Sequence, residues 1–103
     1  MLVDYQEIQS IKEQVIRLFK PEKILMFGSQ AKGSARQQSD IDLCIIFNTD
    51  NKRALLADMY LQIDSKRPLD LILYTPQEWS QVAGESGTFA YMIAEKGEEI
   101  YGR

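Results

Sequence analysis

The sequence predicts a single layered domain of the α/β or α+β class, and three observations support this. The chain has 103 residues, the length of one domain rather than two. Its 45% hydrophobic and 26% charged residues are typical of a globular protein. Helical and strand patterns follow one another in the order α-β-α-β-α-β-α-α-β, which is typical of helices layered on a sheet. No internal repeat or linker interrupts them, so we expect residues 1–103 to form one domain.

The first half of the chain alternates helical and strand patterns. In order, these patterns predict a helix over 4–19, a strand over 23–27, a short helix over 29–35 and a strand over 41–47. In the first helix Ile8, Ile11 and Val15 recur at helical spacing, which places Glu7 among the polar residues of the other faces. Pro21 is expected to end this helix.

The second half ends in a pair of helical patterns. In order, the patterns predict a helix over 51–64, a strand over 69–74, a short helix from Pro76, a helix over 89–96 and an edge strand over 98–101. Thr75 and Glu78 fit a capping box around Pro76. Tyr60 falls on the apolar stripe of the helix before the third strand. For Phe89, as for Trp79 and Tyr91, core or half-buried packing is expected ahead of a partner-facing patch.

Composition excludes several function classes. Twelve Lys and Arg against fifteen Asp and Glu give a net charge of -3, which argues against binding nucleic acid by bulk electrostatics. With no histidine, and with Cys44 as its one cysteine, the chain lacks the residues for the usual zinc sites, for an intrachain disulfide and for Ser-His or Cys-His catalysis. Cys44 itself is expected to be a buried small hydrophobe. Neither a membrane-spanning run nor a signal peptide is recognisable, so we expect a cytoplasmic protein with no membrane partner.

A glycine-serine turn follows the first predicted strand. Gly28 permits a tight turn and close backbone approach by a ligand, and Ser29 with the free N–H groups of a helix start favours a phosphate. The spacing of Gly28 and Gly33 is that of a P-loop, but Ser34 and Ala35 stand where that motif requires Lys and then Ser or Thr. The turn alone therefore predicts a phosphate site no more strongly than a ligand-free connection.

Two carboxylates open the second predicted strand. Alternation places Asp40 and Asp42 on one face and Ile41 and Leu43 on the other. Paired acids on an apolar strand repel one another, and a hard cation such as Mg²⁺ would neutralise them. If the third strand lies beside the second, Asp70 can join the pair. The alternative is that Asp40 belongs to a turn, Asp42 faces solvent on an edge strand and Asp70 is an ordinary acid at a strand start.

These residues together resemble a known family. Gly28-Ser29 is separated by ten residues from Asp40-x-Asp42, with Gly33 and Ser39 at fixed positions between them. This run is similar to that of the minimal, MNT-type members of the polymerase-beta-like nucleotidyltransferase superfamily. The resemblance implies a nucleotidyltransferase fold, a small mixed sheet with helices packed against it. It also implies an enzyme that transfers a nucleoside monophosphate from an NTP, usually ATP, to an acceptor hydroxyl and releases pyrophosphate.

The resemblance also implies a role for each site residue. Asp40 and Asp42 would ligate two Mg²⁺ ions, while Asp70 would ligate the ion that activates the acceptor and could take the acceptor's proton. Two metals clamping the attacking and leaving oxygens suit this chemistry. The expected nucleotide-binding residues are Gly28, Ser29, Lys32, Gly33 and Ser39, with Gly28 and Ser29 on the β- and γ-phosphates. Lys32 stands where many relatives carry Arg, so it keeps the charge but lacks the bidentate fork.

The acceptor is expected to come from outside the chain, because larger relatives hold it on an extra domain for which 103 residues leave no room. The sequence is similar to the antitoxins of HEPN–MNT toxin–antitoxin pairs. This implies a HEPN-type toxin as partner, adenylylated on a tyrosine in a type VII-like system. Two alternatives stay open: an antitoxin that neutralises by binding alone, and a small-molecule or RNA nucleotidyltransferase with a separate acceptor-binding subunit. RNA is disfavoured as a direct ligand because no basic face is apparent.

Overall fold

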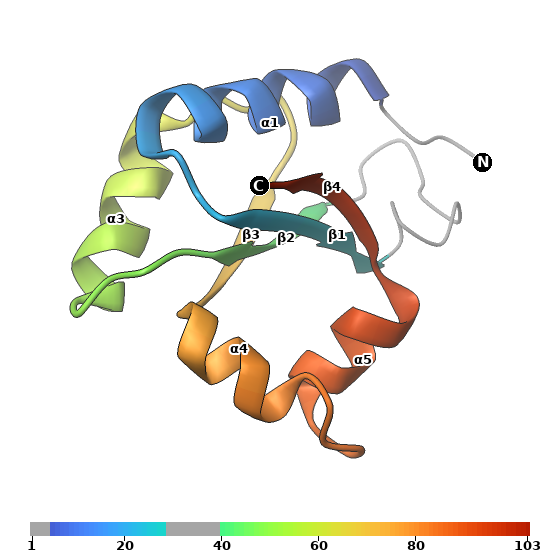
Figure 1. Ribbon diagram of the computed structural model, residues 1–103. Coiled ribbons are helices and arrows are strands. Elements are labelled where there is room, and N and C mark those ends of the chain that lie inside the picture. The colour runs from blue at the N-terminus through green and yellow to red at the C-terminus, as the bar shows by residue number, and fades with distance from the viewer. Residues whose placement is uncertain (1–4, 29–39) are drawn as a thin grey trace.

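The computed structural model describes residues 5–28 and 40–103, and within them four strands form one mixed sheet in the order β3-β2-β1-β4 (Figure 1). The strands are β1 (Lys23–Phe27), β2 (Ile41–Ile46), β3 (Leu69–Tyr74) and β4 (Glu98–Gly102). The described helices are α1 (Tyr5–Phe19), α3 (Lys52–Gln62), α4 (Pro76–Val82) and α5 (Phe89–Lys96). The α+β class and the small mixed sheet predicted from the sequence are confirmed. The helix predicted over 29–35 lies outside the described residues.

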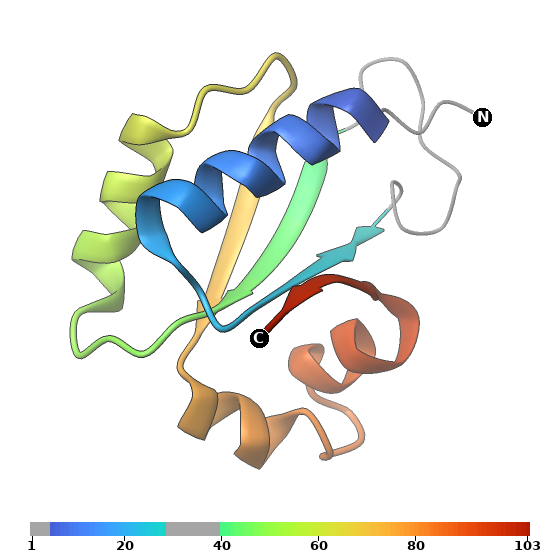
Figure 2. The same ribbon diagram turned by 45° about the horizontal axis from the view of Figure 1, so that its top comes forward.

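Helices cover both faces of the sheet. α1 and α3 lie on one face, and α4 and α5 lie on the other (Figures 1 and 2). The larger apolar cluster fills the space under α1 and α3. Its buried members are Ile8, Ile11, Val15, Ile24, Met26, Ile41, Leu43, Ile45, Met59, Ile63, Leu71 and Leu73. A smaller cluster under α4 and α5 has as buried members Leu25, Phe27, Cys44, Ile46 and Ile93.

The pairing of β2 determines which side chains share a face. β2 runs antiparallel to β1 and parallel to β3, and β4 pairs antiparallel with the other edge of β1. Because side chains alternate along a strand, Ile41 and Leu43 enter the larger cluster, whereas Asp42 and Cys44 lie on the face of α4 and α5. In the β2–β3 register Asp42 is the direct partner of Asp70.

The helix after β2 is shorter than predicted, and its stripe is narrower. α3 spans Lys52–Gln62 instead of 51–64, because the Asn51 side chain caps it, accepting a 3.1 Å hydrogen bond from the Ala54 N–H, and Ile63 is already extended. Tyr60, predicted on the buried stripe, is 44% exposed. Its hydroxyl instead accepts a 2.7 Å hydrogen bond from the Leu71 N–H, which satisfies a backbone donor of the edge strand β3.

The polar side of α1 is partly buried, contrary to the expectation for Glu7. The Glu7 side chain is buried, and its carboxylate accepts a hydrogen bond from the backbone N–H of Lys66. Gln14 makes a matching pair of 2.8 Å bonds, donating to the Asp64 carbonyl and accepting from the Asp64 N–H. Helical periodicity cannot reveal such contacts, because they depend on a loop 50 to 59 residues away in the sequence.

The capping box before α4 is confirmed. Thr75 Oγ1 accepts a 3.1 Å bond from the Glu78 N–H, and a Glu78 carboxylate oxygen accepts a 2.9 Å bond from the Thr75 N–H. The latter bond and the Lys52 ammonium at 3.0 Å hold the pKa of Glu78 below its ordinary value. Trp79 packs against Tyr74, with ring centroids 5.5 Å apart.

Among the residues described, no helix combines the length and the apolar character needed to cross a membrane.

Leu43→Ala is expected to lower the free energy of unfolding by about 2–5 kcal/mol, because it opens a cavity in the larger cluster under the central strand. The matched control is Leu61→Ala. Leu61 is 82% exposed, so its loss is expected to change stability by less than about 0.5 kcal/mol. Urea denaturation followed by circular dichroism measures both values. Equal effects of the two substitutions would contradict the assignment of the core.

Candidate functional site

Asp42 and Asp70 form the centre of the candidate site. Each is the second residue of its strand, and parallel pairing in register sets the two acids side by side on the face of α4 and α5. Asp42 is half-buried and Asp70 is exposed. Asp40 precedes β2 directly and is exposed. The structure thus confirms that the second and third strands are neighbours, as the sequence analysis required for Asp70 to join the pair.

The electrostatics of Asp42 are unfavourable for its charged form. Burial raises the pKa of the Asp42 carboxyl above its usual value, and the negative charges of Asp70 and then Asp40 raise it further. No Lys or Arg of residues 5–28 and 40–103 forms a salt bridge with Asp42 or Asp70. The negative charge is therefore concentrated without a compensating side chain from this part of the chain, and a cation beside Asp42 would relieve the repulsion.

Gly28 lies against the Asp42 carboxylate at the end of β1. Its φ is +75°, a left-handed conformation that side chains disfavour. A Cβ atom at this position would overlap with Oδ2 of Asp42 and lie 3.1 Å from its Cγ. Phe27, the preceding residue, is the register partner of Asp42. Residue 28 must therefore be glycine both for its backbone conformation and for the space that the carboxylate occupies.

The carboxylate oxygens of this site fit a hard cation, but the described side chains do not complete its coordination by themselves. In the described ranges no three Asp, Glu, His or Cys side chains gather closely enough to form a metal site by themselves. Two of the acids are nevertheless direct register partners, and the third, Asp40, raises the pKa of Asp42. Mg²⁺ is commonly held by one or two carboxylates together with substrate phosphates and water. The residues present fit an ion of that kind, whose coordination is completed by a phosphate ligand.

The other predicted nucleotide-binding residues cannot be placed. Ser29, Lys32, Gly33 and Ser39 lie outside the described residues, so their assignments stay predictions.

Phe89 is a neighbour of the site that sequence reasoning missed. Instead of packing in the core it is 47% exposed, and its ring meets that of Phe27 edge to face, with centroids 5.6 Å apart and an angle of 88°. The helical phase of the α5 sequence indicated this exposure. Ala90 and Ile93, three residues apart, are the buried positions of α5, which leaves Phe89 beside the apolar stripe.

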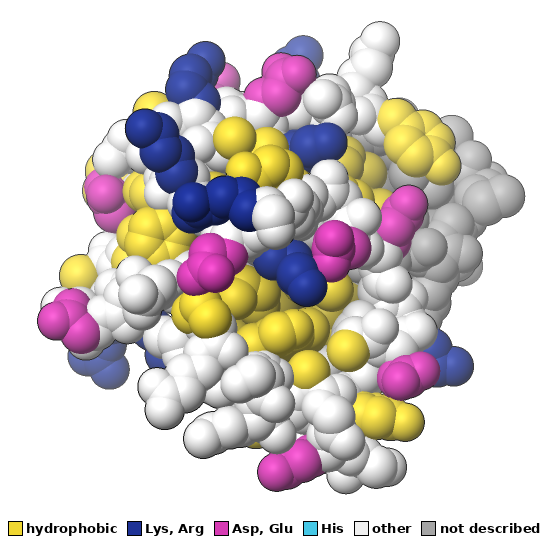
Figure 3. Space-filling model, in the orientation of Figure 1, with side chains coloured by type: hydrophobic (Ala, Val, Ile, Leu, Met, Phe, Trp, Pro, Cys, Tyr) yellow, Lys and Arg dark blue, Asp and Glu magenta, His cyan; other side chains and the backbone are white. Residues whose placement is uncertain are grey.

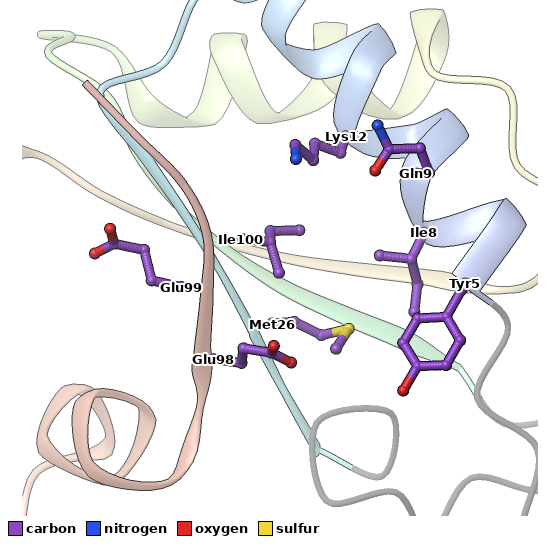
Figure 4. A pocket seen from close by; sticks show the side chains of 8 residues that line it. All are labelled: Tyr5, Ile8, Gln9, Lys12, Met26, Glu98, Glu99 and Ile100. Atoms are coloured by element: carbon purple, nitrogen blue, oxygen red, sulfur yellow. The ribbon is translucent and has the colours of Figure 1, made fainter.

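A cavity of about 280 Å³ lies elsewhere, between α1 and β4 (Figure 4). Ile8 and Met26 form part of its apolar lining, with Lys12 and Glu98 among its polar side chains. Ile8 and Met26 belong to the cluster under α1, whereas Asp42 and Asp70 face α4 and α5. The cavity is thus on the opposite face of the sheet and is not the space in front of the acids.

Among the described residues the one thiol is not a competing site, and the face shown in Figure 3 carries no continuous basic surface. Cys44 is fully buried, which confirms the prediction of a buried small hydrophobe, and burial raises its pKa to about 12. On the face shown in Figure 3, Lys and Arg side chains are interspersed with Asp and Glu and with apolar surface. This face therefore lacks the continuous basic tract typical of nucleic-acid binding.

Comparisons with known proteins place this chain in a family. A search of the curated proteins found no match. Among solved structures, a Sulfolobus solfataricus protein provisionally assigned as a nucleotidyltransferase aligns with a TM-score of 0.60 and 22% identity, over 95% of this chain and 79% of that chain. A toxin-antitoxin structure with AMP-PNP aligns with a TM-score of 0.53 and 19% identity, over 99% of this chain and 75% of that chain. At these identities both likenesses concern the fold.

The family profile described as nucleotidyltransferase domain matches residues 8–97. This range includes every described helix and strand except β4 and the first three residues of α1. Gly28, Asp42 and Asp70 all lie within the matched range. The chain belongs to the nucleotidyltransferase domain family.

Proposed function

We propose that this chain is a Mg²⁺-dependent nucleotidyltransferase that transfers AMP, or another nucleoside monophosphate, from an NTP to a hydroxyl on a separate protein. The observation that carries the proposal is the in-register pair Asp42 and Asp70, with Gly28 held against the Asp42 carboxylate. Family membership supports nucleotidyl transfer as the reaction class. ATP is the expected donor, and two Mg²⁺ ions are the expected cofactors.

The proposed reaction is an in-line displacement at the α-phosphorus. The acceptor oxygen forms a bond to the α-phosphorus. The bond from the α-phosphorus to the oxygen that joins it to the β-phosphorus breaks, and pyrophosphate leaves with the electron pair. Asp70 is exposed and can take the proton of the acceptor hydroxyl. Asp42 and Asp40, together with Asp70, would hold the Mg²⁺ ions, which supply charge neutralisation for the attacking and leaving oxygens. Gly28, Ser29, Lys32, Gly33 and Ser39 would bind the triphosphate.

The proposed acceptor is a tyrosine of a HEPN-type toxin, which would make this chain the antitoxin of a type VII-like pair. The fold likeness to a toxin-antitoxin structure with AMP-PNP supports this finer proposal. The exposed position of Asp70 also favours catalysis on an external acceptor, because a large acceptor can reach the carboxylate from outside the chain.

The test is to incubate the purified chain with the protein encoded beside it, ATP and Mg²⁺, and to measure the intact mass of that protein. We expect a gain of one or more AMP units that disappears with the Asp40→Asn/Asp42→Asn double variant. Co-purification of the two proteins provides the binding control. A stable complex with no mass gain from any of the four NTPs would contradict transfer and favour an antitoxin that acts by contact alone.

Asp42→Asn is expected to abolish transfer and yet to stabilise the metal-free protein at about pH 7. Burial and neighbouring acids raise the pKa of Asp42 in the folded chain above its unfolded value. The folded form thus binds the proton more tightly, and stability declines as pH rises through the unfolded and then the folded pKa. Asn carries no charge for burial and the neighbouring acids to disfavour. The thermal midpoint of the Asp42→Asn protein in EDTA should therefore exceed that of the wild type at neutral pH.

The advantage of Asp42→Asn should shrink as the pH falls through the raised pKa of the folded Asp42 and then through the ordinary aspartate pKa of about 3.9. Asp50→Asn, at an exposed loop position, is the matched control and should leave the midpoint unchanged. An Asp42→Asn midpoint below that of the wild type at neutral pH would refute the account of repulsion.

Gly28→Ala is expected to lower the transfer rate by about two orders of magnitude, because displacement of Asp42 by even ~1 Å misplaces the reacting groups. The left-handed backbone adds a cost of about 1–2 kcal/mol in stability. Gly84→Ala is the control, since a Cβ there meets no atom within 4 Å. Steady-state rates with excess ATP and thermal midpoints measure both effects. Full activity of Gly28→Ala would show that the Asp42 carboxylate does not need its observed position.

A further inference from the structure

An exposed aromatic ring contacts the strand neighbour of the acid pair. Phe89 is the first residue of α5, and nearly half of its surface is accessible to solvent. Its ring contacts Phe27 edge to face, and Phe27 is at once the register partner of Asp42 and the residue before Gly28. Phe89 is thus one side chain removed from the carboxylate at the centre of the site.

The position of this ring is set by rigid elements. Thr88 caps α5, its hydroxyl accepting a 3.0 Å bond from the Tyr91 N–H, while Ala90 and Ile93 fix the helix in the core. Phe27 is buried and holds the ring of Phe89 from one side. Phe89 therefore presents a pre-oriented apolar surface to solvent at a place where burial would be favourable.

We propose that Phe89 is a stacking platform for the nucleobase of the NTP, an inference that rests on the proposed function. An NTP whose phosphates lie at Gly28 and the acids must direct its base to a neighbouring surface, and the ring of Phe89 is a flat apolar surface in contact with Phe27, the residue before Gly28. Phenylalanine offers no donor or acceptor to the edge of a base. The platform therefore binds any base by its face, with little preference among the four.

The experiment compares the Kd values of Mg²⁺·ATP and Mg²⁺·tripolyphosphate by titration calorimetry in the absence of an acceptor. Stacking predicts that the wild type binds ATP more tightly than tripolyphosphate. Phe89→Ala should weaken ATP binding by about 5- to 100-fold and leave tripolyphosphate binding unchanged. Phe89→Trp should keep or strengthen ATP binding, because it retains an aromatic face.

Two controls separate stacking from damage to the fold. Phe89→Leu preserves an apolar side chain but removes the aromatic face, so it should also weaken ATP binding selectively. It replaces Phe89→Ala if that variant is unstable. Tyr5→Ala removes a 72% exposed aromatic ring at the cavity on the opposite face of the sheet, and it should change neither Kd value.

Three results would overturn the inference, and they differ in what they say of the proposed function. Unchanged ATP binding by Phe89→Ala would refute the platform and leave nucleotidyl transfer intact. Equal losses of ATP and tripolyphosphate binding would show that Phe89 supports the phosphate site and not the base. A wild type that binds neither ligand would refute the proposed function together with the platform.

Discussion

The parallel register of β2 and β3 is the constraint on which the site depends. It places Asp42 beside Asp70, where their like charges repel each other. The opposite faces of the same strands carry Ile41, Leu43 and Leu71 into the apolar core under α1 and α3. A slip of one residue would send the acids into that core, so burial of the apolar side chains fixes the register that brings the acids together.

The antiparallel pairing of β1 with β2 brings a glycine turn to the acids. The last residue of β1, Phe27, pairs with Asp42, and the chain then turns at Gly28 with the carboxylate in the space that a side chain would fill. The close approach of backbone and carboxylate puts Gly28, which is proposed to bind phosphate, next to the candidate cation site. α5, packed on β1, adds Phe89 at the margin. The three parts of the proposed nucleotide site thus converge on the end of one strand.

Local patterns predicted most of the fold, because apolar periodicity and caps are local properties. The strands, the capping box at Thr75 and the alternation around Asp42 follow from neighbouring residues and are confirmed. The errors arose where a distant segment decides the outcome. Glu7 is buried by the backbone of Lys66, and Tyr60 leaves its stripe to bond the β3 edge. For Phe89 the helical phase of Ala90 and Ile93 indicated a position beside the apolar stripe, but its contact with Phe27 depends on how α5 packs against β1.

A crystal structure with Mn²⁺ in place of Mg²⁺ and with AMP-PNP would test the central claim most directly, since anomalous scattering locates the metal independently of the nucleotide. The account predicts a metal ligated by Asp42 and Asp70 and by phosphate oxygens, on the face of the sheet that carries α4 and α5. A metal and nucleotide bound away from both carboxylates, for example in the cavity between α1 and β4, would contradict it.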